Sequence, residues 1–344
     1  MLVVISVFLE ILVRVWGYST MYFYDPIYLP FSKSQEIPYI MKSNLHHVRA
    51  HGNIWINTDA LGLRSPAPAR TYENKPTDEY RLAFVGDSVT FGVGVPTGET
   101  YPEIVEKSLN HLQHQCRIVG FNFAVSSYSV KEMAATLKYR VPEVTPDLVI
   151  MGVVIDDFDT KRTPQVDKWG YNTHGGASQL INRFPTFKLI LRQIHFSYLI
   201  RDILSRTIMG QEKNYESIDG KLPPIVANSY KYIQEFKKIA EEHRYSYLVV
   251  NLPSVKGNGS QFTEIIKNMK NDKINYYDTS FIATLFTVKE YHASTYDWHP
   301  SALVHQRIGA MLSGYVLKNF IEKSCHKKSA HNFSDIRNNY RDMP

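Results

Sequence analysis

From residue 80 onward, short apolar segments alternate with amphipathic segments, and this alternation restricts the fold more than any other feature of the chain. The apolar segments have the length of buried strands and cover 81–86, 117–124, 147–155, 245–252 and 274–278. Helices are predicted between them near 101–114, 130–140 and 226–243, and a last helix is predicted to start at Pro300. Strands that alternate with helices favour a parallel sheet with helices on both faces. The sequence therefore predicts an α/β fold around a parallel five-stranded sheet.

The chain outside this pattern divides into three further regions. Residues 1–17 are almost wholly apolar and predict an N-terminal membrane anchor. A packed amphipathic helix is the alternative, because a full span needs about 20 residues. Residues 18–79 are rich in Tyr, Pro and Asn and indicate an irregular lead-in with a short hairpin near 52–64. The α/β domain is predicted to cover 80–322, and the polar tail 323–344 has too few apolar groups to pack.

A long insertion separates the third and fourth predicted strands, at about 158–225. Within it, residues 184–208 show an aromatic and basic amphipathic helix pattern. The pattern fits a lid or a flap that contacts a membrane. It also fits an ordinary helix packed on the sheet.

Charge and cysteine content exclude several classes of function. The net charge of +6 is spread over 344 residues, and no basic stripe alternates with stacking aromatics, so no nucleic-acid partner is predicted. Cys116 and Cys325 are far apart in sequence and one lies in the polar tail, so neither a disulfide nor a cysteine metal site is predicted. The acidic cluster 156–159 lacks the ligand spacing of a calcium loop. We therefore predict no metal and no cofactor.

A serine follows the first predicted strand, in the segment Gly86-Asp87-Ser88. The catalytic surface of a parallel sheet lies at the carboxyl ends of its strands. A serine becomes a nucleophile when a base takes its proton and a third group orients that base. Asp297 and His299, just ahead of the last helix, supply an acid and a base. The backbone amides of Ser88 and of the turn 125–129 are candidates for stabilising a developing oxyanion.

Over about residues 80–320 the sequence resembles the SGNH, or GDSL, hydrolases. The family's first block is matched by 86–88, its second loosely by 122–127, its third by 154–157, and its fifth by Asp297 and His299. The resemblance implies a flavodoxin-like three-layer α/β/α sandwich. It also implies catalysis by Ser88, His299 and Asp297, with an oxyanion hole formed by Ser88, Ser127 and Asp156. The lead-in, with its Gly-Leu-Arg at 62–64, is similar to that of membrane-anchored bacterial members.

Three positions depart from the family's pattern. Ser127 stands where the family has a glycine whose amide enters the oxyanion hole. Asp156 replaces an asparagine, and an ionised carboxylate can only accept hydrogen bonds, whereas an asparagine amide donates them. A single residue separates Asp297 from His299, whereas two residues commonly separate the acid and the base in the family. The shorter spacing resembles the branch that handles O-acetyl groups on exported polysaccharides such as alginate.

Other polar residues near these motifs receive structural interpretations. Asp87 is expected to bond within its own turn, Asp157 to hold neighbouring backbone, and His305 to pack in a helix. The histidines at 46, 47 and 51 show no partner pattern and are interpreted as surface residues.

The predicted function is that of a serine-dependent ester hydrolase, which acts through an acyl-enzyme on an ester of a carbohydrate or lipid. The same residues fit an O-acyltransferase for an exported polysaccharide, or a catalytically weakened protein that binds polysaccharide or lipid in an assembly. The anchor and the resemblance predict a membrane-anchored protein whose catalytic domain lies outside the cytoplasm. The sequence makes no prediction of oligomeric state.

Overall fold

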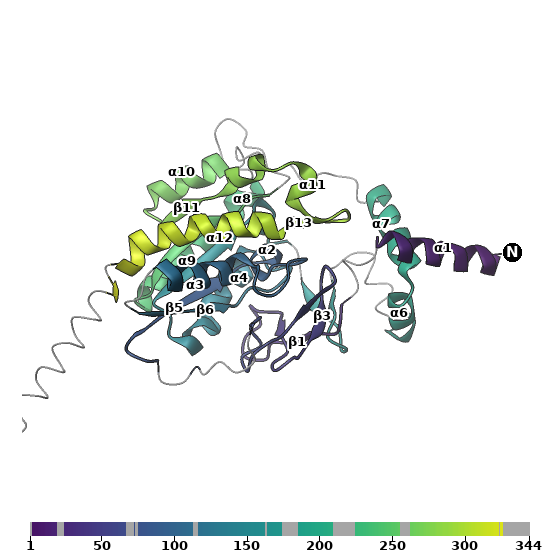
Figure 1. The fold of residues 1–344 in the computed structure, drawn as a ribbon, viewed down its shortest axis with the longest axis horizontal. Coiled ribbons are helices and arrows are strands. Elements are labelled where there is room, and N and C mark those ends of the chain that lie inside the picture. The colour runs from purple at the N-terminus through teal and green to yellow at the C-terminus, as the bar shows by residue number, and fades with distance from the viewer. Residues whose placement is uncertain are drawn as a thin grey trace, which may run out of the picture.

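The structure is a computed structural model that describes residues 2–18, 24–66, 72, 75–112, 116–161, 164–173, 185–208, 224–254, 262–322 and 324–325. At its centre, five parallel strands form a sheet in the order β11–β10–β7–β5–β6 (Figure 1). The strands are β5 (Glu79–Val85), β6 (Arg117–Asn122), β7 (Leu148–Val153), β10 (Ser246–Asn251) and β11 (Tyr276–Asp278). All five predicted strands are confirmed, and the order along the sheet is that of a flavodoxin-like fold.

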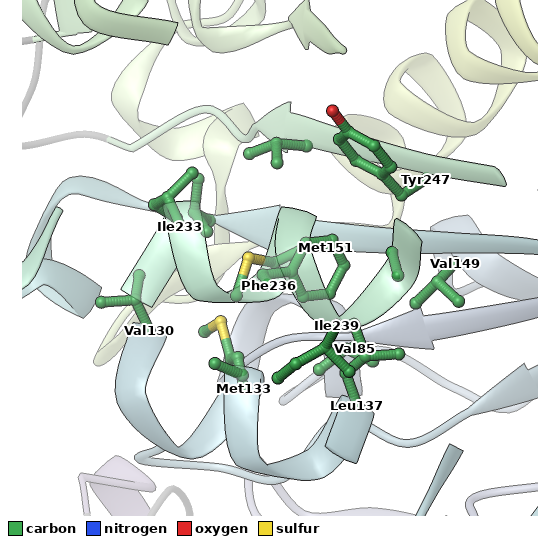
Figure 2. Packing of buried hydrophobic residues seen from close by; sticks show 14 of the residues in the cluster. Val85, Val130, Met133, Leu137, Val149, Met151, Ile233, Phe236, Ile239 and Tyr247 are labelled. Carbon is green, nitrogen blue, oxygen red and sulfur yellow. The ribbon is translucent and has the colours of Figure 1, made fainter. Parts of the chain in front are cut away.

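Helices cover both faces of the sheet, which becomes the middle of three layers. The covering helices are α3 (Tyr101–Leu112), α4 (Val130–Tyr139), α9 (Lys231–Glu242), α10 (Thr263–Asn271) and α12 (Ala302–Val316). On one face, Met133 of α4 and Phe236 of α9 pack with Val85 and its neighbours (Figure 2). On the other face, α3 and α12 pack over Phe84. Alternate residues of one strand therefore enter different clusters, which explains why the strands are apolar throughout.

Local signals set where these helices begin and end. α4 starts with a capping box, in which Ser129 and Glu132 satisfy each other's backbone amides. The predicted helix 226–243 is instead two helices, α8 (Pro224–Ser229) and α9. The last helix starts two residues later than expected, because Pro300 ends a strand and Ser301 is the N-cap.

His305 lies in the interface between α12 and α3. Its side chain is fully buried, and its Nδ1 accepts a hydrogen bond from the backbone N–H of Tyr101 at 3.0 Å. Burial lowers the pKa of His305 to about 3, and the nearby charges of Arg64 and His299 act in the same direction. The ring is therefore neutral at physiological pH and caps the first turn of α3. The structural interpretation of this histidine is confirmed.

The lead-in contains more regular structure than the sequence indicated. Its strands are β1 (Tyr28–Pro30), β2 (Tyr39–Met41), β3 (Val48–Ala50) and β4 (Ile54–Ile56), and they form two antiparallel pairs. The hairpin expected near 52–64 is thus found at 48–56. The buried side of both pairs shares a hydrophobic cluster with Phe91, Val93 and Tyr128 of the sandwich. The lead-in therefore packs directly onto the domain that carries Ser88.

The N-terminal helix α1 (Leu2–Trp16) docks on the insertion after β7. The described part of the insertion includes β8 (Gln165–Val166), β9 (Asn172–Thr173), α6 (Pro185–Arg192) and α7 (His195–Ile208). The single helix pattern expected over 184–208 is therefore broken between α6 and α7. The Glu10 carboxylate accepts hydrogen bonds from the backbone N–H groups of His195 and Phe196, at 3.0 and 2.9 Å. Within the described residues, no helix combines the length and the apolar character that a membrane crossing requires.

The prediction that the two cysteines stay apart is wrong. Cys116, at the start of β6, forms a disulfide with Cys325, beyond the end of α12, and the two Cα atoms lie 5.8 Å apart. Both side chains are buried in the cluster between α3, α12 and the sheet. The prediction failed because α12 runs back along the sheet and brings the chain close to the start of β6. The distance between the two cysteines in the sequence does not reveal this approach. The remainder of the polar tail, 326–344, lies outside the described residues.

Candidate active site

Ser88 is the first residue of the short helix α2 (Ser88–Phe91), which follows β5 directly. Asp87 is its N-cap, and one carboxylate oxygen accepts a hydrogen bond from the backbone N–H of Val89 at 2.9 Å. Gly86 allows this tight passage from strand to helix, because a Cβ there would lie 2.1 Å from the Thr90 hydroxyl oxygen. The serine hydroxyl is thereby held at the carboxyl end of a central strand, where the order of strands along the sheet reverses.

Asp297 and His299 lie on the short strand β13 (Asp297–Pro300), which pairs with β12 (His292–Ser294) just before α12. Side chains two residues apart on a strand point to the same side, and the one between them points away. Asp297 is accordingly buried and His299 partly buried, whereas the Trp298 side chain is 58% exposed. The single-residue spacing between acid and base is therefore a consequence of strand geometry.

A chain of hydrogen bonds connects the three side chains. The distance from His299 Nδ1 to Asp297 Oδ1 is 2.6 Å, and that from His299 Nε2 to Ser88 Oγ is 2.9 Å. Because the carboxylate can only accept, Nδ1 carries the proton and Nε2 is left as the acceptor for the serine hydroxyl. Ser88 Oγ also lies 3.1 Å from Asp87 Oδ2, a second acceptor for the same proton. The structure thus joins the nucleophile, base and acid that the sequence suggested.

Asp297 remains ionised despite its burial. Burial raises the pKa of its carboxyl, but hydrogen bonds and the charge of His299 outweigh this effect and hold the pKa below its ordinary value. The backbone N–H of His299 adds a hydrogen bond to the same oxygen at 3.1 Å. The carboxylate can therefore orient the imidazole and stabilise the imidazolium that forms when the serine loses its proton.

The other oxygen of Asp297 is enclosed by the lead-in. Oδ2 is buried and has no hydrogen-bond partner among the residues that the structure describes. Cβ atoms placed on Gly52 and Gly94 would lie 3.1 and 3.0 Å from it, and one on Gly52 would also meet the Gly94 backbone at 2.4 Å. The turn of the β3–β4 hairpin therefore rests on the loop after α2, and the two glycines enclose the Asp297 carboxylate.

Arg64 ties the end of the lead-in to the same loop. Its guanidinium donates hydrogen bonds to the backbone carbonyls of Phe91 and Gly92, both at 2.8 Å, and of Val95 at 2.7 Å. The residue is only 4% exposed, and burial lowers its pKa to about 10, so it stays charged at neutral pH. Arg64 thereby fixes the end of α2 and the loop that carries Gly94.

The predicted oxyanion hole is only partly defined. The Ser88 backbone N–H is in the first turn of α2, where helix amides lack an intrahelical acceptor. Ser127 has φ +75°, a conformation that favours glycine, so its backbone matches the family's pattern although its side chain does not. Asp156 lies in the 3₁₀ turn Ile155–Phe158 after β7, partly exposed. The participation of these three residues in an oxyanion hole stays a prediction.

The remaining polar candidates divide into structural and surface residues. Asp157 is buried and its carboxylate accepts a hydrogen bond from the backbone N–H of Val154 at 2.9 Å, which confirms its expected role. His46 and His47 are exposed, as expected. His51 is not a simple surface residue, because it is partly buried and its ring contacts the Tyr24 ring at a tilt, with ring centres 3.8 Å apart. The sequence gives no sign of this packing, which involves segments that show no periodicity.

Comparisons with known proteins give structural likenesses only. No protein-family model matches the chain, and no curated protein matches its sequence. Similar solved structures include a member of the lipolytic protein G-D-S-L family from Veillonella parvula, with 13% identity and a TM-score of 0.40, covering 70% of this chain and 98% of that one. A lipase from a goat rumen metagenome has 16% identity and a TM-score of 0.43, and the match covers 69% of this chain and 98% of the lipase. An acetyl xylan esterase has 11% identity and a TM-score of 0.42, and the match covers 69% of this chain and 99% of the esterase. Because these TM-scores lie below 0.5, the functional assignment rests on the sheet topology and the Ser88 site of this chain.

Substitution of Arg64 tests how strongly the lead-in supports the site. Arg64→Met keeps most of the side-chain volume but removes the donors to three buried carbonyls. We expect the free energy of unfolding to fall by about 3 kcal/mol or more, measured by denaturant titration. Arg117→Met is the control, because the Arg117 side chain is 68% exposed and its buried partner Glu79 keeps an ion pair with Arg81. The control should cost about 1 kcal/mol or less. Equal losses in the two variants would show that Arg64 has no special structural role.

Proposed function

We propose that the protein is a serine ester hydrolase of the SGNH type that acts through an acyl-enzyme. The observation that carries the proposal is the hydrogen-bonded chain from Ser88 through His299 to a buried, ionised Asp297. The flavodoxin-like sheet supports it, because the nucleophile stands at the carboxyl end of a central strand. An ester of a carbohydrate or a lipid is the proposed class of substrate.

In the proposed mechanism, Ser88 Oγ attacks the ester carbonyl carbon while its proton passes to His299 Nε2. The carbonyl electron pair moves to the oxygen, and the backbone amides of Ser88 and Ser127 stabilise the oxyanion. Collapse of this intermediate breaks the ester bond, and the imidazolium returns the proton to the leaving alcohol. Water then attacks the acyl-enzyme with His299 as base, which releases the acid and restores Ser88. A sugar hydroxyl in place of water would complete an acyl transfer.

We also propose that the catalytic domain lies outside the cytoplasm. The support is the buried disulfide between Cys116 and Cys325, because disulfides persist in oxidising compartments and are rare in reducing ones. Both cysteines of the chain take part in this disulfide, so we expect the folded protein to contain no free thiol.

Loss of the catalytic side chains tests the hydrolase directly. With p-nitrophenyl acetate as the substrate, Ser88→Ala and His299→Ala should each lower kcat/KM by at least about 1,000-fold, because either change removes an activated nucleophile. His46→Ala, an exposed histidine outside the site, is the control and should keep the wild-type rate. A wild-type protein that folds cooperatively and hydrolyses no simple ester would favour the alternative of a weakened binding protein.

Asp156→Asn distinguishes an efficient from a weakened oxyanion hole. An asparagine amide can donate a hydrogen bond to the oxyanion, whereas a carboxylate can only accept one. We expect kcat for the same ester to rise by about tenfold or more, since one oxyanion donor is worth about 100-fold or more in other enzymes. A rate that is unchanged or lower in the variant would show that Asp156 is not part of the oxyanion hole.

The compartment is tested by counting thiols. Protein that is trapped with an alkylating reagent in intact cells should show no modified cysteine before reduction and two after it, as measured by mass spectrometry. Two modified cysteines before reduction would contradict an oxidising location.

A further inference from the structure

Apolar side chains are exposed on two helical segments that are far apart in the sequence. On α1 the exposed residues follow helical spacing at Val4, Val7, Phe8, Ile11 and Val15, and Ile5 and Trp16 widen this exposed apolar face. On α6 and α7 they comprise Phe187, Ile190, Ile200 and Ile203, with Ile194 between the two helices. Exposed apolar faces of this extent mark surfaces that bind another molecule or a membrane.

The two segments form one structural unit. The Glu10 carboxylate accepts hydrogen bonds from both leading backbone amides of α7, and the Arg14 guanidinium donates to Glu10 and to the Gln193 carbonyl. Figure 1 shows α1, α6 and α7 grouped at one end of the molecule, beside rather than over the sheet. We call α1, α6 and α7 together the helical platform.

The platform adjoins the catalytic strand pair. The Tyr18 ring, just after α1, meets the Tyr296 ring edge to face, with centres 5.2 Å apart. Tyr296 directly precedes Asp297, and the exposed Trp298 indole follows it. An exposed tryptophan near an apolar surface is typical of the boundary between lipid and water. The Ser88 site therefore lies close to the platform.

The charge of the platform suits an anionic surface. Residues 2–16 and 185–208 carry five basic and two acidic side chains, a net charge of +3. At the base of the platform, Arg14, Arg49 and His195 line a cavity of about 320 Å³, together with Asp25. The Asp25 carboxylate accepts a hydrogen bond from the Arg49 backbone amide at 2.6 Å. Arginines beside an apolar helical face match the arrangement of phosphate headgroups above acyl chains.

We propose that the helical platform binds the surface of an anionic phospholipid bilayer and holds the Ser88 site next to it. The exposed apolar residues of α1, α6 and α7 enter the boundary between lipid headgroups and acyl chains together, because Glu10 holds α1 against the start of α7. Binding by this face requires neither an active serine nor a helix that crosses the membrane. The Ser88→Ala protein should therefore bind as the wild type does, which separates this proposal from that of the hydrolase.

Vesicle sedimentation with the full chain tests the proposal. The wild type should bind vesicles of equal parts phosphatidylglycerol and phosphatidylcholine, and should bind pure phosphatidylcholine at least about tenfold more weakly. The double substitution F8S/I11S and the double substitution I190S/I203S should each weaken binding by about tenfold or more, through loss of buried apolar area. Leu112→Ser is the matched control, because Leu112 of α3 is 55% exposed, the same fraction as Ile11 and Ile203.

Four results would overturn the proposal. The first is a wild type that sediments with neither vesicle, and the second is equal binding to the two vesicle compositions. The third is a loss of binding in only one of the two double variants, which would show that α1 and the insertion do not act together. The fourth is a solution dimer that both double variants dissociate, without vesicle binding, which would assign the platform to a second copy of this chain. Cooperative unfolding of each variant by circular dichroism excludes misfolding as the cause.

Discussion

The buried carboxylate of Asp297 is the constraint on which the rest of the site depends. A charge in this position is stable only while His299 and its backbone amide compensate the cost of burial, and they do so by occupying a single oxygen, Oδ1. The imidazole is thereby fixed with Nε2 toward Ser88. His299 thus takes its orientation from β13 and Ser88 takes its position from β5, so the contact between them follows from how those two strands are placed.

The placement of these strands requires parts of the chain that contain no catalytic residue. The hairpin turn at Gly52 covers the acid, and Arg64 holds the loop that follows the nucleophile. The disulfide joins the start of β6 to the segment beyond α12, the helix that begins beside His299. The segment before residue 79 is therefore a structural part of the site as well as a connection to α1.

The sequence predicted what depends on local patterns and missed what depends on packing. Short apolar runs identified the five strands, and the resemblance of the Gly-Asp-Ser and Asp-x-His segments to family motifs identified Ser88, Asp297 and His299 as candidate nucleophile, acid and base. The roles of Gly52, Gly94 and Arg64 could not be predicted, since each depends on the approach of two backbones from different regions. The pairing of Cys116 with Cys325 was missed for the same reason, because 209 residues separate the two.

In the proposed mechanism, His299 activates the hydroxyl of Ser88. The most direct measurement is mass spectrometry of the protein after reaction with a fluorophosphonate probe, which modifies only activated serines. We expect one phosphonylated residue in the wild type, Ser88, and no modification in folded His299→Ala protein. Modification of a different serine, or modification of Ser88 that persists without His299, would show that His299 does not activate Ser88.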